Sequence, residues 1–183
     1  TTRPFFEHQL SGAEFLVERG GGLLADSVGC GKSGTAICAA ETFVSQCTNK
    51  PYAPRVVIGP KFLRKVWESE HRKANAPGPF TMLEGTDVSK GFKTDALWFF
   101  VHYDIVEVWW SYLHALRPAV VICDEAHMIK NYKTSRYKGA EMAMSPAPLR
   151  LALTGTPIPN KISESHALLS LACGKWSWGN RGE

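Results

Sequence analysis

The chain has 183 residues, a hydrophobic fraction of 44% and a net charge of +4 at pH 7. The length is that of one domain, the composition excludes a disordered or low-complexity chain, and the apolar runs are too short to span a membrane. Five scattered cysteines without a C-x-x-C pair favour a reduced, intracellular protein, and the mild charge permits a polyanionic partner without requiring one.

Hydrophobic periodicity predicts helices that alternate with short strands along the chain. In chain order we expect a helix over 5–19, a strand over 23–25, a helix over 33–46, a strand over 55–59, a helix over 61–74, strands over 80–83 and 97–101, a helix over 105–116, a strand over 119–123, a helix over 137–144, a strand over 149–153 and a helix over 163–171. The central strands are apolar without alternation, which is typical of a parallel sheet covered on both faces. The sequence therefore predicts an α/β fold with three layers and a mostly parallel central sheet.

The segment between the first strand and the second helix, A-D-S-V-G-C-G-K-S, has the composition of a phosphate-binding loop. Glycines let the backbone curl so that N–H groups face phosphate oxygens, and the helix start adds partial positive charge. Lys32 can reach the β- and γ-phosphates, and the Ser33 hydroxyl can ligate Mg²⁺. The alternative is a glycine-rich turn with an exposed lysine, since Asp26 stands where the general pattern has glycine. The predicted nucleotide-binding residues of this loop are Gly29, Cys30, Gly31, Lys32, Ser33 and Gly34.

An acidic motif, D-E-A-H at 124–127, follows directly on the apolar strand over 119–123. Because ligands of α/β sheets bind beyond the carboxyl ends of strands, we expect it at the same edge as the phosphate loop. There Asp124 can help to hold Mg²⁺, and Glu125 can orient or deprotonate an attacking water. The alternative is that the pair only starts a turn or caps a helix. His127 is either a packed or capping histidine or a hydrogen-bonded link to Thr154.

With these two motifs in this order, the chain resembles the first RecA-like lobe of a Swi/Snf-type ATPase, within the superfamily-two helicases. D-E-A-H-M-I-K-N at 124–131 is similar to the extended acidic motif of that family, and R-L-A-L-T-G-T-P-I-P-N at 150–160 is similar to its third motif. Ala25 and Asp26 before the glycines also resemble the phosphate loop of that family. The resemblance spans residues 3–172 and implies a RecA-like P-loop NTPase lobe.

Three further segments carry the same resemblance. F-E-H-Q-L-S-G at 6–12 resembles the adenine-recognising glutamine motif, which implies that Gln9 contacts adenine. V-V-I-G-P-K-F-L-R-K-V-W-E-S-E at 56–70 resembles the next motif, and V-H-Y-D at 101–104 resembles a later motif near the nucleic acid. In the third motif, Thr154, Gly155 and Thr156 are expected to sense the γ-phosphate and to couple its state to DNA. A turn with local hydroxyl hydrogen bonds is the alternative for this last segment.

Basic residues follow two of the predicted strands at the ligand-binding edge. Lys61, Arg64 and Lys65 follow the strand over 55–59, and further lysines and arginines follow the acidic motif. Phosphate contacts from such side chains are independent of sequence, although solvated helix faces are the alternative. With the family motifs included, the predicted nucleic-acid contacts are Pro60, Lys61, His102, Tyr103, Lys130 and Asn131.

A cluster of aromatic residues allows two interpretations. It can stack on bases, or it can pack in the core. We favour the core because Trp98, Phe99 and Phe100 belong to a predicted buried strand. The members of the cluster are Trp98, Phe99, Phe100, Trp109, Trp110 and Tyr112.

The resemblance implies a DNA-dependent ATPase that uses ATP and Mg²⁺ to translocate on duplex DNA or to remodel protein–DNA complexes. We expect residues 1–173 to form the ATP-binding lobe and residues 174–183 to begin the connection to a second RecA-like lobe. In this family the second lobe carries the arginines that complete the ATP site. An arginine finger is worth ~10³–10⁵ in rate, so we expect a monomeric fragment with weak ATPase activity.

Two other functions stay open from the sequence. One is a strand-separating DNA or RNA helicase of the same superfamily. The other is a regulatory module that binds ATP without hydrolysing it. Lys32 and Glu125 are both present, so nothing in the sequence marks the site as inactive.

Overall fold

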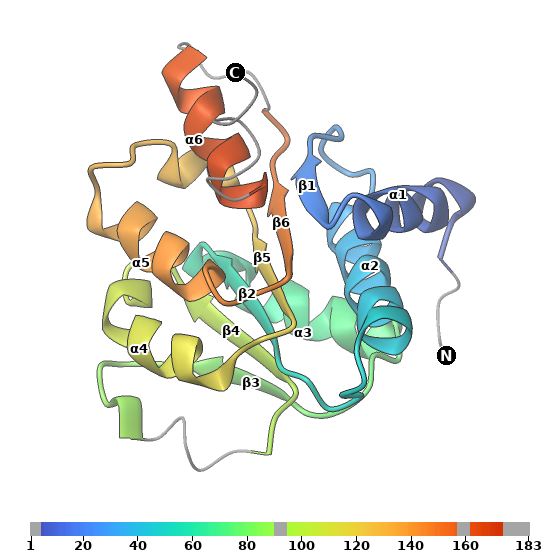
Figure 1. Cartoon of the computed structure of the whole chain (residues 1–183), viewed down its shortest axis with the longest axis horizontal. Coiled ribbons are helices and arrows are strands. Elements are labelled where there is room, and N and C mark those ends of the chain that lie inside the picture. The colour runs from blue at the N-terminus through green and yellow to red at the C-terminus, as the bar shows by residue number, and fades with distance from the viewer. Residues whose placement is uncertain (1–4, 90–94, 157–161, 174–183) are drawn as a thin grey trace, which may run out of the picture.

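The computed structural model describes residues 5–89, 95–156 and 162–173. Six strands form one central sheet, and helices cover both of its faces (Figure 1). In chain order the elements are α1 (Glu7–Glu18), β1 (Gly21–Leu24), α2 (Lys32–Cys47), β2 (Arg55–Gly59), η1 (Lys61–Leu63), α3 (Arg64–Lys73), β3 (Phe80–Leu83), β4 (Trp98–His102), α4 (Val106–Leu116), β5 (Val120–Cys123), η3 (Ala126–Ile129), α5 (Ser135–Met144), β6 (Leu149–Leu153) and α6 (Ile162–Cys173).

The predicted elements agree with the observed ones within two residues at each end. The bounds of β2, β3 and β6 are identical to those predicted. Each is a short, largely apolar run with a proline or a polar residue directly before and after it. The single helix predicted over 61–74 is instead a 3₁₀ turn, η1, that continues into α3. The 3₁₀ turn η3, directly after the acidic pair, was not predicted.

All six strands are parallel, in the order β1-β6-β5-β2-β4-β3. This arrangement confirms the predicted α/β class with a parallel sheet. Because parallel strands end at the same edge, the loops after β1, β2, β4, β5 and β6 all emerge together. The order also inserts β6 between β1 and β5, so that the segment after β6 lies between the phosphate loop and the acidic motif.

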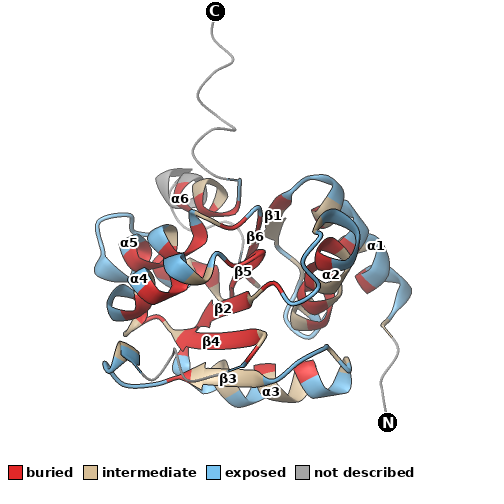
Figure 2. Cartoon of the chain, turned by 60° about the horizontal axis from the view of Figure 1, so that its bottom comes forward, coloured by how far each residue is buried: buried red, intermediate tan, exposed pale blue. Residues whose placement is uncertain are grey.

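Each face of the sheet has its own layer of helices. α1, α2 and α3 share one hydrophobic cluster with strand residues such as Val57 and Ile122. α4, α5 and α6 share the other with residues such as Val56 and Val121. Successive residues of a strand thus point into different clusters, and β2, β4 and β5 are buried through most of their length (Figure 2). The long apolar runs of the sequence are explained by this burial on both faces.

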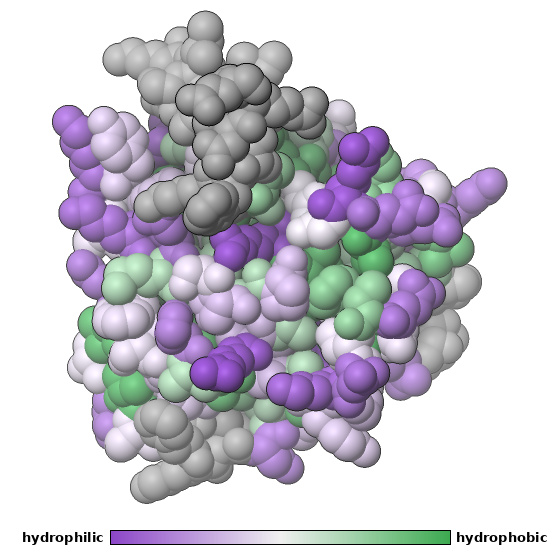
Figure 3. Space-filling view, viewed as in Figure 1, coloured by the Kyte–Doolittle hydropathy of each residue, from purple (hydrophilic) through white to green (hydrophobic). Residues whose placement is uncertain are grey.

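Five of the six residues of the aromatic cluster belong to the core, as predicted, and Trp110 is half-buried. Trp98, Phe99, Phe100, Trp109 and Tyr112 are at most 3% exposed. Burial of their rings excludes base stacking by these five side chains. Other apolar side chains lie at the surface over α1 and α2 (Figure 3), where Phe6, Leu10 and Phe15 are about half exposed.

Some expectations concern residues outside the described ranges. Residues 174–183, expected to begin a connection, are among them, and so is the end of the third motif at 157–160. Within the described part of the chain, no helix combines the length and the apolar character needed to cross a membrane.

Candidate nucleotide-binding site

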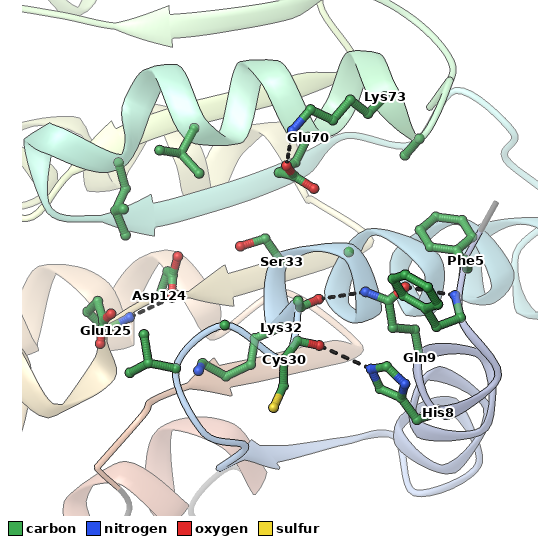
Figure 4. Close-up of a pocket in the computed structure, with 18 residues that line it drawn as sticks. Phe5, His8, Gln9, Cys30, Lys32, Ser33, Glu70, Lys73, Asp124 and Glu125 are labelled. Atoms are coloured by element: carbon green, nitrogen blue, oxygen red, sulfur yellow. Dashed lines mark hydrogen bonds and ion pairs between the residues drawn. The ribbon is translucent and has the colours of Figure 1, made fainter. Parts of the chain in front are cut away.

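A cavity of about 420 Å³ opens at the carboxyl edge of the sheet, between the phosphate loop, α1 and α3. Asp124 and Glu125 lie at one end of it, and Phe5, His8 and Gln9 lie at the other, with α3 facing the loop (Figure 4). The cavity thus brings together residues from opposite halves of the sequence. The predicted residues that line it are Gln9, Gly29, Cys30, Gly31, Lys32, Ser33, Gly34, Asp124 and Glu125.

The phosphate loop wraps around its own lysine. Lys32 Nζ donates hydrogen bonds to the carbonyl oxygens of Asp26 at 2.9 Å and Ser27 at 3.1 Å. Gly31, the N-cap of α2, has φ 78° and ψ 33°, a left-handed conformation that a glycine adopts without cost. Lys32 and Ser33 therefore form the first turn of α2, where unpaired N–H groups favour an anion.

Gln9 joins α1 to the phosphate loop through both ends of its amide. Its Oε1 accepts from Phe6 N at 2.9 Å, and its Nε2 donates to the Gly31 carbonyl at 3.0 Å. The neighbouring His8 Nε2 lies 3.1 Å from the Cys30 carbonyl. An amide group offers two donors and two acceptor positions, so each end of the Gln9 side chain keeps one position for a ligand.

Asp124 is 5% exposed and extends the ladder between β5 and β2. Its Oδ2 accepts from Trp67 Nε1 at 2.8 Å, and its Oδ1 accepts from Glu125 N at 2.8 Å. Burial raises the pKa of the Asp124 carboxyl, and the charge of Glu125 adds to this effect. Both hydrogen bonds and the charge of Lys32 act in the opposite direction on this pKa. Lys32 and Asp124 line the same cavity, so the two opposite charges face one space.

A row of polar side chains leads from the acidic motif to the end of β6. Glu125 Oε2 lies 3.2 Å from His127 Nδ1, which lies 3.3 Å from Thr154 Oγ1. Thr154 is fully buried, and its N–H donates to the Leu24 carbonyl at the end of β1. His127 is thus placed between the acidic pair and Thr154.

The third motif also approaches the phosphate loop directly. A Cβ added at Gly155 would lie 2.9 Å from Val28 Cγ2 and 3.8 Å from Lys32 Nζ. Thr156 N donates to Thr154 Oγ1 at 3.1 Å, so the turn predicted for this segment is present. A side chain at Gly155 would therefore require the exposed Val28 side chain to move.

The predicted nucleic-acid residues separate into exposed and buried ones. Lys61 and His102 line a second recess of about 250 Å³ at the same edge of the sheet. Lys130 is half-buried and Asn131 is exposed, directly after η3. Arg64 forms an ion pair with Glu84 at 2.6 Å.

Two of these predictions do not fit the structure. The Tyr103 side chain is 2% exposed, and its hydroxyl donates to the Asp124 carbonyl at 2.7 Å. It therefore offers no surface to a nucleic acid, and its position is in the core beneath the acidic pair. Pro60 is also buried, so its ring is not part of an exposed interface.

Sequence reasoning gave no role in the site to Trp67, Glu70 and Lys73, all on α3. Glu70 and Lys73 line the cavity and form an ion pair at 2.7 Å, and Trp67 holds Asp124. The family resemblance contained Trp67 and Glu70 but gave them no role. The signal available was the spacing of three residues between them, which places both on one side of a helix.

Comparisons with known proteins identify the family of this chain. The profile of the SNF2-related domain matches residues 8–178. This chain belongs to the SNF2 family. Its fold is that of the first RecA-like lobe of a Swi/Snf-type ATPase, and this confirms the resemblance stated from the motifs.

The relatives that match this chain are longer proteins, and it spans only a small part of each. Helicase SWR1 of Gibberella zeae is 31% identical in an alignment 176 residues long, which covers 89% of this chain and 10% of that protein. The SWI/SNF-related matrix-associated actin-dependent regulator of chromatin subfamily A-like protein 1 of Bos taurus is 31% identical in an alignment 160 residues long, which covers 85% of this chain and 16% of that protein. The Sulfolobus solfataricus SWI2/SNF2 ATPase core, solved with dsDNA, matches with a TM-score of 0.81 at 26% identity, over 94% of this chain and 36% of that one.

Proposed function

We propose that this SNF2 lobe binds ATP with Mg²⁺ in the 420 Å³ cavity and contributes to hydrolysis of the β–γ anhydride. The observation that carries the proposal is the convergence of the Lys32 loop and the Asp124–Glu125 pair on this one cavity. At its other end, Gln9 and His8 border the space for the base. Lys32, now bonded to loop carbonyls, is the cation that would turn to the terminal phosphates.

The residues of the cavity fit a metal that arrives with the nucleotide. Among the described residues, no group of three or more His, Cys, Asp or Glu side chains could hold a metal ion. Mg²⁺ commonly uses one or two protein oxygens together with substrate phosphates and waters. The Ser33 hydroxyl and the Asp124 carboxylate are such oxygens, and the ion would neutralise charge on the β- and γ-phosphates.

Glu125 is the group that we assign to the attacking water. Its side chain is partly exposed at the cavity, unlike that of Asp124, and it lies one residue further along the turn. A carboxylate in this position accepts a proton from water and orients it. His127 and Thr154, in hydrogen-bond distance of one another, are the route by which we expect the phosphate state to reach the third motif.

Duplex DNA is the proposed polyanionic partner, bound across the edge that carries Lys61, His102 and Asn131. Translocation or remodelling would require a second RecA-like lobe to complete the ATP site. We therefore expect this lobe to hydrolyse ATP slowly on its own, because an arginine finger contributes ~10³–10⁵ in rate. We also expect an intracellular location for the protein.

A Glu125→Gln variant tests this function, with Glu14→Gln on the exposed face of α1 as the matched control. ATP binding and phosphate release are measured with and without duplex DNA. We expect Glu125→Gln to retain binding and to lower turnover by about 10²–10⁴, the usual contribution of a general base. Equal turnover in both variants would support the module that binds without hydrolysis. Efficient strand separation by the active protein would favour the helicase alternative, and fast turnover by this lobe alone would contradict the need for a second lobe.

A further inference from the structure

Two buried aromatic side chains hold Asp124 at its two ends. Trp67, on α3, donates its indole N–H to the carboxylate oxygen Oδ2 at 2.8 Å. Tyr103, directly after β4, donates its hydroxyl to the main-chain oxygen of the same residue at 2.7 Å. Trp67 is fully buried, and Tyr103 and Asp124 are 2% and 5% exposed. The proposed chemistry makes no direct use of either ring.

Two further hydrogen bonds hold the main chain and the carboxylate of Asp124. Its N–H donates to the Ile58 carbonyl at 2.8 Å, and its Oδ1 accepts from Glu125 N at 2.8 Å. Every polar group of the residue therefore has a partner, and the partners come from β2, α3, the end of β4 and the following turn. A carboxylate has about four acceptor positions, so two bonds still leave positions for a metal-bound water.

The same hydrogen bonds also restrain the backbone of Glu125. Glu125 has φ 49° and ψ 46°, a left-handed conformation that costs a side-chain-bearing residue about 1–2 kcal/mol. Such a conformation persists only where the surroundings impose it. The bond from Glu125 N to Asp124 Oδ1 is one such restraint, and Trp67 holds the other oxygen of that carboxylate. Rotation of the carboxylate would break both bonds at once.

We propose that Trp67 and Tyr103 are positioning residues that set the Asp124 carboxylate and the Glu125 turn in the geometry that Mg²⁺·ATP requires. This assignment rests on the proposed function and adds to it two residues that do not touch the nucleotide. Hydrogen bonds to a charged acceptor are strong and directional in a buried setting. Partners behind a metal ligand commonly change metal affinity by 10–100-fold when removed.

The chain supplies matched controls for a purely structural role. Trp98 is equally buried, and its indole N–H donates to a carboxylate oxygen of Glu41 at 3.1 Å, at the amino end of the sheet and away from the cavity. Tyr137, on α5, is 5% exposed and lines no part of the cavity. Trp67→Phe and Tyr103→Phe remove a donor beside Asp124, whereas Trp98→Phe and Tyr137→Phe remove the same groups elsewhere.

The experiment measures binding of a fluorescent ATP analogue in EDTA and in saturating Mg²⁺, and compares the ratio of the two dissociation constants. The gain from Mg²⁺ is the dissociation constant in EDTA divided by that in Mg²⁺. We expect Trp67→Phe to reduce this ratio about tenfold or more, and Tyr103→Phe to change it in the same direction. Binding in EDTA should stay within twofold. The controls should keep the full gain even where they lower the melting temperature as much. An unchanged ratio in folded Trp67→Phe and Tyr103→Phe would overturn the proposal.

A second measurement needs no variant. In protein labelled with ¹⁵N-tryptophan, the indole N–H resonance of Trp67 should shift when Mg²⁺ is added to the ATP-bound protein, and that of Trp98 should not. Equal responses of the two resonances would overturn the positioning role. Failure of the unmodified protein to bind ATP at all would instead refute the proposed function, and this inference with it.

Discussion

The side-chain amide of Gln9 lies against Gly31: its Nε2 donates to the Gly31 carbonyl at 3.0 Å, and a Cβ added at Gly31 would collide with that same nitrogen. The start of α1 is thereby fastened to the start of α2 without any nucleotide. A second Cβ, at Gly34, would lie 2.8 Å from the same atom. The glutamine expected to contact adenine is therefore also a structural support of the phosphate loop.

This contact predicts different effects for two glycines of the loop. Gly29→Ala and Gly31→Ala both place alanine at a positive φ, 92° and 78°, which costs about 1–2 kcal/mol. Nothing lies within 4 Å of a Cβ at Gly29, whereas one at Gly31 meets Gln9. We expect Gly31→Ala to lower the free energy of unfolding by more than Gly29→Ala does and to weaken ATP binding further. Denaturant unfolding and nucleotide titration check this, and equal effects of the two variants would disprove the role of the contact.

The recess shared by Lys61 and His102 predicts a local contribution to DNA binding. Lys61 is exposed at the carboxyl edge of the sheet, and Lys50 is exposed in the loop that leads into the amino end of β2. Each phosphate contact contributes about 1 to the slope of log K against log salt. Lys61→Glu should therefore reduce that slope by about 1 or more, and Lys50→Glu should leave it nearly unchanged. If the two variants gave the same slope, Lys61 would be removed from the interface.

A buried histidine predicts that acid destabilises the fold. His71, on α3, is 9% exposed, its Nε2 has no hydrogen-bond partner, and its ring packs on Phe80 and Trp98. Burial lowers the pKa of His71 below its ordinary value of 6.5, although a hydrogen bond with the Pro77 backbone opposes the shift. As the pH falls, the unfolded chain therefore takes up this proton before the folded one does. The contribution to stability is complete above about pH 6.5 and is lost as the pH falls through the folded pKa.

The measurement compares the free energy of unfolding at pH 7.5 and pH 5. The unmodified protein should lose more stability across this range than His71→Phe, because phenylalanine has no proton to bind. His114→Phe, at an exposed position of α4, is the matched control and should follow the unmodified protein. The opposite order, with His71→Phe more sensitive to acid, would contradict the prediction. Taking differences between variants removes the contributions of Glu41 and Asp124, whose pKa values burial raises.

The helices, the strands and the two ends of the site could be predicted from local patterns of residues. β2, β3 and β6 were predicted at their observed bounds because each is a short, largely apolar run, and its limits are visible in a few consecutive residues. The loop around Lys32 was predicted for a similar reason, since glycine spacing and a following helix are local features. The acidic pair at Asp124 was expected at the same edge because parallel strands end together.

The contacts between these two ends depend on the packing of elements that are distant in the sequence. The sequence left open whether His127 is a packed or capping histidine or a link to Thr154. The strand order, which no local pattern encodes, brings the ends of β5 and β6 together and places Thr154 Oγ1 3.3 Å from His127 Nδ1. From the sequence, Trp67 was predicted to lie in a helix, and Tyr103 was predicted to contact nucleic acid. Their bonds to Asp124 depend on how α3 and the end of β4 pack around β5. Short-range periodicity predicts which face of an element is buried. The acceptor of a buried N–H or hydroxyl depends on how elements distant in the sequence pack together.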